Sequence, residues 1–368
     1  MIDMSATVSG YSTGLQSNPA LLPEILAAAR MCLVQFCGLN PGEKVLIVCE
    51  PDTDSLISGA FLSACLESKA EAAIITVPPF SAGGWIRGSP SDFVVTACRE
   101  ADLLVACTYF ELAHSERSFY HTFFGTRTRV CSLAMAANPG CLISAAKFPM
   151  ELYFEISKRV AKSLRDSKVI RFTSGLGTNL EFSNLAALTN SKPLADGDWD
   201  LFPPIGINFY SEVTNGTLYF DESTITGKST RPFKMSIKDN LVQSIEGEVE
   251  SEIDALRAFA NGSYYVRHAV IGLHPKIRTM NVPQFELARA AGVVTVGLDG
   301  TGPSGKIERA GPGFSHLDCT LDTPTVTVDD EALVRNRRLL ALDDRDIIEM
   351  AKSYGDPRKI LAQNPFFW

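Results

Sequence analysis

Short, almost wholly apolar runs alternate with helical segments through the N-terminal part of the chain, and this pattern constrains the fold most. The runs are "KVLIVCE" at 44–50, "EAAIITVPP" at 71–79, "DLLVACTYF" at 102–110 and "TRVCSLAMA" at 128–136. Helical spacing of apolar residues precedes or separates them at 19–37, 54–70 and 90–101. Strands that are buried on both faces have this continuous apolar character. The alternation predicts a parallel α/β sheet over about residues 20 to 145.

The pattern of apolar and polar residues changes after a helical segment that ends near residue 167. "SKVIRFTSGLGTNLEFS" at 167–183 and the long segment 216–248 alternate apolar and polar residues between Gly, Asn and Asp turns. Such alternation is typical of antiparallel sheets. Helical patches follow at 251–260 and 282–292. We therefore expect an α/β domain with a parallel sheet at 1–165, followed by an α+β domain rich in antiparallel strands at 166–368.

Composition narrows the possible partners. The 368 residues are 45% hydrophobic, which is enough for two cored domains, and the formal net charge is −8, from 34 Lys and Arg against 42 Asp and Glu. No basic stripe follows the chain, so we expect no nucleic-acid partner. The first apolar run leads into "EPDTDS" rather than a Gly-x-Gly-x-x-Gly fingerprint, so NAD binding is not supported. Small molecules and other proteins remain as possible partners.

The cysteines and the chain ends bear on location and assembly. None of the nine cysteines forms a Cys-x-x-Cys pair, and Cys49 and Cys107 lie in apolar runs, which favours a reducing compartment. The N-terminus is polar and no uninterrupted run approaches 18 apolar residues, so we expect a cytoplasmic protein without a membrane span. A polar N-terminal arm and the terminal Phe366, Phe367 and Trp368 suggest a homo-oligomer, although a tail folded onto its own chain fits equally well.

A metal site is indicated by "GPGFSHLDCTLD" at 311–322. In a strand, His316 and Asp318 would point to the same face and offer two ligands to one ion. A solvated strand edge, or a hydrogen bond between the two side chains, would explain the pair as well. His268 in "SYYVRHAVIGLHP" interrupts an apolar surround and is a candidate third ligand, or else a core histidine satisfied by the backbone. His274, beside Pro275, is expected in a loop.

Several carboxylates could extend this site. Glu212 lies in the β-rich region, and Glu248, Glu250 and Glu252 would share one strand face if a strand extended that far. Two histidines with one carboxylate are the ligand set of non-haem Fe(II) oxygenases. A richer set of carboxylates would favour a two-metal hydrolase instead.

Five segments together resemble the 2,5-dihydroxypyridine 5,6-dioxygenase family, whose superfamily includes the M29-type metalloaminopeptidases. They are "SHLDCTLDTPTVTVDDEALV" at 315–334, "YYVRHAVIGLHPKIRT" at 264–279, "GDWDLFPPIG" at 197–206, "GTLYFD" at 216–221 and "LAHSERS" at 112–118. The similarity runs from roughly residue 40 to 335. The His-x-Asp pair with an upstream histidine is its most specific part.

This resemblance implies a ring-cleaving, extradiol-type dioxygenase acting on a hydroxylated N-heterocyclic or aromatic ring with O2. It implies that His268, His316 and Asp318 bind Fe(II), and that His114 acts as an acid/base or substrate-orienting group. The sequence departs from the family at Leu201, where the dioxygenase has a histidine, and in "GLGTNLEFSNLAAL" at 175–188. These positions would shape the substrate pocket.

Two other functions stay open at this point. One is a metal-dependent hydrolase, either an M29-like aminopeptidase or a cyclic amide hydrolase. It would use Zn(II), Mn(II) or Co(II), with Glu212 or Glu250 as ligand or base. The other is a small-molecule binding protein that has the fold without the chemistry.

Overall fold

The four apolar runs form strands of one parallel sheet, as the alternation predicts. The structure is a computed structural model that describes residues 18–51, 53–77, 91–108, 123, 125–133, 139–223, 227–260, 263–279, 282, 284–301, 316–321 and 323–364. The sheet has the order β2-β1-β3-β4-β7, and each neighbouring pair is parallel. Its strands are β1 (Lys44–Cys49), β2 (Glu71–Thr76), β3 (Leu103–Cys107), β4 (Arg129–Ser132) and β7 (Trp199–Leu201).

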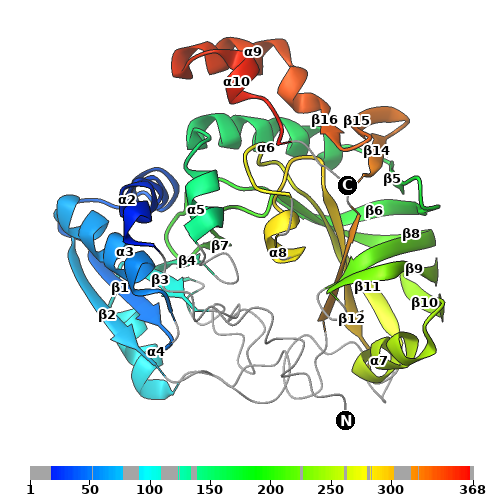
Figure 1. The fold of residues 1–368 in the computed structure, drawn as a ribbon, viewed down its shortest axis with the longest axis horizontal. Helices are drawn as coiled ribbons and strands as arrows, with labels where there is room; N and C mark the ends of the chain where they lie inside the picture. Colours follow the sequence, from blue (N-terminus) through cyan, green and yellow to red (C-terminus); the bar gives the residue numbers. More distant parts are fainter. Residues whose placement is uncertain are drawn as a thin grey trace.

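Helices cover this sheet, at the left of Figure 1. They are η2 (Pro19–Leu21), α2 (Leu22–Arg30), the π-helix η3 (Met31–Phe36), α3 (Ser55–Glu67), α4 (Asp92–Arg99) and α5 (Pro139–Ala145). Asp54 and Ser91 cap the N-termini of α3 and α4 with their side-chain oxygens, which stabilises both helix starts.

The larger sheet has eleven strands and is mostly antiparallel, at the right of Figure 1. Its strands are β5 (Val169–Thr173), β6 (Asn179–Thr189), β8 (Ile207–Ser223), β9 (Gly227–Lys238), β10 (Leu241–Glu246), β11 (Tyr264–Ile271), β12 (Val294–Gly300), β13 (His316–Leu321), β14 (Thr325–Val328), β15 (Glu331–Arg335) and β16 (Arg338–Leu339). The long strand β8 pairs with β6 and β9 and also with β11 and β13. The segment from β8 to β13 therefore curls into a barrel-like arrangement, which leaves fewer open edges.

The remaining helices connect and flank the two sheets. They are α6 (Met150–Arg165), α7 (Glu250–Ala260), α8 (Gln284–Leu287), η6 (Leu340–Asp343), α9 (Arg345–Ala351), η7 (Lys352–Tyr354) and α10 (Pro357–Ile360). One hydrophobic cluster extends from α2 and α3 through α6 to the large sheet. Within it Phe172, Phe182 and Phe209 contact one another with ring centroids 4.8 to 6.0 Å apart.

The predicted fold class is confirmed: a parallel α/β sheet is followed by a large antiparallel sheet. The strand β7 lies beyond residue 165 in sequence yet pairs with β4 of the first sheet. The division into domains at residue 165 stays a prediction.

The structure can be compared with the sequence-based expectations for the segments after residue 245. The helix expected at 282–292 is a single turn, α8. Ala290, three residues after α8 ends, forms a β-bridge with His274 instead of continuing the helix. The helix predicted at 251–260 is confirmed as α7, and the strand before it, β10, ends at Glu246 and does not extend to Glu250 and Glu252. Strand β12 was not expected at all, although "VTVGLDG" is rich in β-branched residues. The N-terminal arm and Phe366, Phe367 and Trp368 lie outside the described residues.

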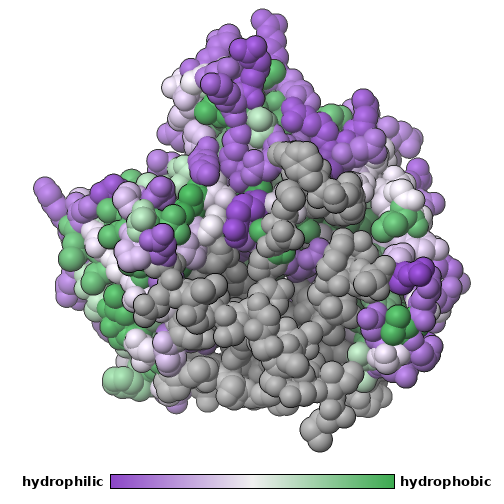
Figure 2. Space-filling model, viewed as in Figure 1, coloured by the Kyte–Doolittle hydropathy of each residue, from purple (hydrophilic) through white to green (hydrophobic). Residues whose placement is uncertain are grey.

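One helical stretch of the described chain, Pro19–Phe36, is long and apolar enough to cross a membrane by length and composition alone. Within it, Ile25, Leu33 and Phe36 are fully buried in the core, so packing inside the chain accounts for part of its apolar character. Figure 2 shows hydrophobic residues at the surface in this region, where Val34 of η3 and Leu66 of α3 are exposed. The surface over α9 and α10 is mostly hydrophilic (Figure 2).

Candidate metal centre

The candidate site lies on one face of three neighbouring strands, β11, β12 and β13. Alternate residues of β12 and β13 point to opposite faces. Val296 and Leu298 of β12 belong to the hydrophobic core, as do Leu317 and Cys319 of β13. The opposite face of β13 carries His316 and Asp318, so the sequence places this pair on the strand face turned away from the core.

Strand β12 aligns the candidate ligands across the sheet. Gly297 pairs with His268 of β11 on one side and with Asp318 of β13 on the other. Asp299, two residues later, pairs with His316. Residues paired across strands share a face. The row His268–Gly297–Asp318 therefore crosses all three strands beside the pair Asp299–His316.

A β-bulge sets the direction of His268. The register between β11 and β12 shifts between Val266 and His268, so Arg267 is an extra residue. Both Val266 and Ala269 are buried in the core, which places His268 on the other face. Without the shift, strict alternation would have turned His268 to the core side together with Val266. The bulge therefore brings this histidine to the same face as Asp318.

The three side chains converge. Their ligand atoms all lie within 4.8 Å of one another. Nε2 of His316 is 3.2 Å from Oδ1 of Asp318, and Nε2 of His268 is 3.7 Å from the same oxygen. The two imidazole centroids are 5.2 Å apart. The core-histidine alternative for His268, remote from the other two residues, does not describe this geometry.

Gly297 provides the space in which His268 lies. A Cβ atom built on Gly297 would be 2.4 Å from Nε2 and 2.6 Å from Cε1 of the His268 ring. Real Cβ atoms do not approach other heavy atoms so closely, so any other residue here would displace the imidazole. The absence of a side chain lets His268 and Asp318 meet across β12.

A second layer of side chains holds the histidines. Nδ1 of His316 is 2.7 Å from Oδ1 of the buried Asp299, which leaves Nε2 directed toward Asp318. The other oxygen of Asp299 is 3.6 Å from Nε of Arg267. The Arg267 guanidinium lies 5.0 Å from the centroid of the Tyr210 ring, which in turn meets the His268 ring edge-on at 5.9 Å. A chain of contacts therefore connects one histidine to the other.

The electrostatics of the cluster suit a cation. Burial disfavours a charged imidazole, but the carboxylates of Asp318 and Asp299 outweigh it and raise the pKa of His316 to about 10. Burial opposes ionisation of Asp318 too, yet the facing imidazoles of His316 and His268 hold its pKa well below the usual range. Two carboxylates thus flank one imidazolium, Asp299 at Nδ1 and Asp318 at Nε2. A metal ion can replace the proton on Nε2 of His316, as it does when histidine ligands bind metals.

The donor set fits a divalent transition metal. Two imidazole nitrogens and one carboxylate oxygen form the facial set of non-haem Fe(II) enzymes, which leaves coordination positions open. Ligands at about 2.1 Å and at right angles would lie about 3 Å apart. The separations of 3.2 and 3.7 Å from Asp318 are close to this value. Among the described residues, the group contains these three side chains and no further carboxylate.

The other sequence candidates lie elsewhere or outside the description. His114 falls in 109–122, outside the described residues. His274 is fully buried, and its ring packs against Phe148 and Tyr153 rather than joining the cluster. Its Nδ1 accepts a hydrogen bond from the backbone N–H of Lys276. The prediction of a loop position was right, but the side chain is part of the core.

The candidate glutamates are not part of the cluster. Glu212 is an exposed residue of β8. Glu248 pairs with Arg231 at 2.9 Å, and Glu250 of α7 pairs with Arg257 at 3.1 Å, all with exposed side chains. The condition under which Glu248, Glu250 and Glu252 would share a strand face is not met, because α7 begins at Glu250.

Sequence reasoning missed Gly297, Asp299 and Arg267. Gly297 and Asp299 lie in "VTVGLDG", where a strand pattern with a glycine and an aspartate two residues apart matches the spacing of "HLD". Recognising that strand would have paired the two motifs. Arg267 carried no signal, because a bulge is not visible in residue types alone.

Fold and site define the class of protein: a two-sheet α/β enzyme whose larger sheet carries two histidines and an aspartate with the geometry of a metal centre. A family model described as 2,5-dihydroxypyridine 5,6-dioxygenase (NicX) matches residues 26–341. The chain belongs to this dioxygenase family, and membership implies a metal cofactor. The resemblance in the sequence is thereby confirmed. Among curated proteins, none matches the chain.

Two solved structures share the fold. The 2,5-dihydroxypyridine dioxygenase from Pseudomonas putida KT2440 is 19% identical, with a TM-score of 0.67 over 85% of this chain and 96% of the other. AmpT from Thermus thermophilus is 10% identical, with a TM-score of 0.55 over 86% of this chain and 99% of the other. At such identities the similarity shows the architecture alone.

Proposed function

We propose that this chain is an Fe(II)-dependent, extradiol-type dioxygenase that cleaves a hydroxylated N-heterocyclic or aromatic ring, with a 2,5-dihydroxypyridine-like substrate. The convergence of His268, His316 and Asp318 carries this proposal, since it matches the ligand set of non-haem iron oxygenases in a chain of a dioxygenase family. In the net reaction a ring carbon–carbon bond beside a hydroxyl-bearing carbon breaks, and both atoms of O2 enter the product.

Different residues of the chain would have different roles in this reaction. His268, His316 and Asp318 would hold Fe(II) on one face and leave its other face open. When bound, Fe(II) supplies the redox chemistry by which the ring reacts with O2. Asp299 would keep Nδ1 of His316 protonated and Nε2 free for the metal. An imidazole nitrogen of His114 would take the hydroxyl proton of the substrate, a role that suits a group titrating near neutrality.

The rival is a metal-dependent hydrolase, an M29-like aminopeptidase or a cyclic amide hydrolase, and the shared fold with AmpT is compatible with it. Such an enzyme would need more carboxylates at the metal. Glu212 is exposed and Glu250 is paired with Arg257 on a surface helix. The described residues around the cluster therefore favour one metal over two.

Metal analysis and oxygen uptake of anaerobically purified protein test the proposal. We expect one iron per chain and consumption of one O2 per molecule of a hydroxypyridine, with both atoms of labelled O2 in the product. Zn(II), Mn(II) or Co(II) in two equivalents, together with cleavage of a peptide or cyclic amide and no oxygen uptake, would support the hydrolase instead. A chain that binds the ring compounds but retains no metal would be a binding protein.

A further inference from the structure

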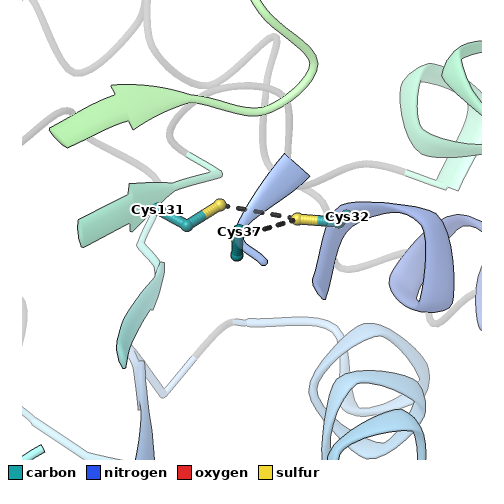
Figure 3. A group of neighbouring side chains, drawn as sticks. All are labelled: Cys32, Cys37 and Cys131. Atoms are coloured by element: carbon teal, nitrogen blue, oxygen red, sulfur yellow. Dashed lines mark hydrogen bonds between the residues drawn. The ribbon is translucent and has the colours of Figure 1, made fainter. Parts of the chain in front are cut away.

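The side chains of Cys32, Cys37 and Cys131 lie together in the core, where the π-helix η3 packs against the parallel sheet (Figure 3). They are far in sequence from the candidate metal centre. Sγ of Cys32 is 4.0 Å from Sγ of Cys37 and 3.5 Å from Sγ of Cys131. The three sulfurs all lie within 4.8 Å of one another, and each residue is a free, fully buried cysteine. The proposed dioxygenase chemistry uses none of them.

The local fold builds this cluster from two elements. Cys32 lies in the π-helix η3 and Cys37 directly follows it, and the N–H of Cys37 donates to the carbonyl of Cys32 at 2.8 Å. In an α-helix, side chains five residues apart point in different directions. The wider π-turn lets these two sulfurs approach each other, and such turns are frequent at functional sites. Cys131, in the middle of β4, completes the triangle.

A buried cation lies beside the sulfurs. Arg129 precedes Cys131 by two residues on β4, so both share a face of the strand. Its Nη1 donates to the carbonyls of Cys37 and Gly38 at 2.8 and 2.9 Å, and its Nη2 is 2.7 Å from Glu43. The guanidinium therefore places a positive charge next to Cys37, which favours thiolate ligands in this cluster.

We propose that Cys32, Cys37 and Cys131 form a second metal site, for a soft, thiophilic d10 ion of the Cu(I) type bound by three sulfurs. Metal–sulfur bonds of about 2.3 Å in a trigonal arrangement place the sulfurs about 4.0 Å apart. The Cys32–Cys37 separation of 4.0 Å equals this value, and the Cys32–Cys131 separation of 3.5 Å is somewhat shorter. When the ion binds, three S–H bonds break and three metal–sulfur bonds form, the three protons pass to solvent, and no oxidation state changes.

The coordination number selects the kind of ion. Structural zinc sites almost always have four protein ligands. In the part of the chain that the structure describes, this group holds three ligand atoms and no fourth His, Cys, Asp or Glu. Asp200 of β7 pairs with Cys131 across the sheet but is not a member of the group. Thiolate ligands favour Cu(I), Zn(II) and Fe–S clusters. Zn(II) sites and Fe–S clusters usually have four protein ligands, so a site of three thiolates fits Cu(I) best.

The test loads metal-free protein anaerobically with Cu(I) supplied as a weak chelator complex. We expect one tightly held Cu(I) per chain, a thiolate-to-copper charge-transfer band, and three sulfur neighbours at about 2.3 Å in X-ray absorption at the copper edge. Cys131→Ser and Cys32→Ser should each lose the band. Cys98→Ser is the matched control, since Cys98 is also fully buried in this part of the fold but lies outside the cluster.

Other outcomes would overturn the proposal. Nitrogen or oxygen neighbours in the wild-type spectrum would place copper at the histidine–aspartate cluster instead. A band that survives Cys131→Ser but is lost in Cys107→Ser would assign it to Cys49 and Cys107, which face each other on β1 and β3. The wild-type spectrum decides even where a serine variant fails to fold. Because no readout uses turnover, the result is independent of the proposed dioxygenase activity.

Discussion

His316 illustrates how single residues make this site. Its two ring nitrogens have separate partners, Asp299 at Nδ1 and Asp318 at Nε2, so the imidazole is fixed in position and tautomer. Histidine ligands of metals commonly depend on such an outer carboxylate. Asp299 is therefore a positioning residue, because it would act on the metal through His316 without touching it.

Replacing Asp299 with Asn should weaken metal binding while leaving the fold intact. The amide oxygen can still accept from His316 but carries no charge, so we expect Fe(II) affinity to fall by about 10- to 100-fold. Competition with a chelator measures this, and a denaturant titration checks folding. Asp343→Asn, at a surface pair with Arg338, is the control. Unchanged affinity in Asp299→Asn would remove Asp299 from the site.

His114 is the one proposed catalytic residue outside the described chain. His114→Ala should leave iron content near normal and lower turnover by roughly 10²- to 10⁴-fold, the usual contribution of a general acid/base. The wild-type rate should also show a pH dependence that the variant lacks. A variant with the wild-type rate at every pH would return His114 to the role of a surface residue.

At the scale of elements, the sequence predicted most strands and one half of the site. The spacing of His316 and Asp318 placed both on one face of a strand because alternation is a property of the backbone. The side of β11 on which His268 lies could not be predicted, since the bulge at Arg267 changes the phase without a marker in residue type. Strand β12, which joins the two halves, was missed.

Gly297 makes the role of β12 testable. In Gly297→Ala the new Cβ would collide with the His268 ring, so the imidazole must move and metal affinity should fall by more than about 10-fold. Stability should fall by about 1 to 3 kcal/mol, as for other overpacked sites. Gly59→Ala is the control, because no atom lies within 4 Å of its Cβ position and it lies inside helix α3. That control should gain about 1 kcal/mol. Full metal affinity in Gly297→Ala would contradict the packing described here.

At the scale of the whole molecule, the buried His274 makes the free energy of unfolding depend on pH. Burial lowers the pKa of His274 to about 3, whereas an unfolded chain protonates histidine near 6.5. The unfolded state therefore binds one proton more between these values, and stability is lost as the pH falls. The wild type should lose roughly 2 kcal/mol from this group between pH 7 and 5.

Denaturant titrations of the wild type and His274→Gln at the two pH values measure this loss. The variant has no titrating group at this position, so its stability should fall less between pH 7 and 5 than that of the wild type. The variant is less stable at pH 7 if the ring packing with Phe148 and Tyr153 matters, and only the difference between pH values is diagnostic. Equal pH slopes for both proteins would mean that His274 is not held neutral by the fold.

The overall architecture was predictable because the spacing of apolar residues along a strand reflects which of its faces are buried. The two sheets differ in how many faces of their strands are buried. The parallel strands β1, β3 and β4 are almost wholly buried, while β5 and β6 alternate. The closure of the larger sheet through β8 was not predictable, since pairing of β8 with β11 and β13 joins strands far apart in sequence. The two halves of the site are joined by β12, which pairs with both β11 and β13.

The central claim is that His268, His316 and Asp318 jointly hold the iron. Anomalous diffraction at the iron edge, from crystals grown anaerobically with Fe(II), tests it most directly. We predict one peak about 2.1 Å from Nε2 of both histidines and from an oxygen of Asp318, absent in folded His316→Ala and Asp318→Ala protein. A peak at other residues, or one that persists in both variants, would contradict the account.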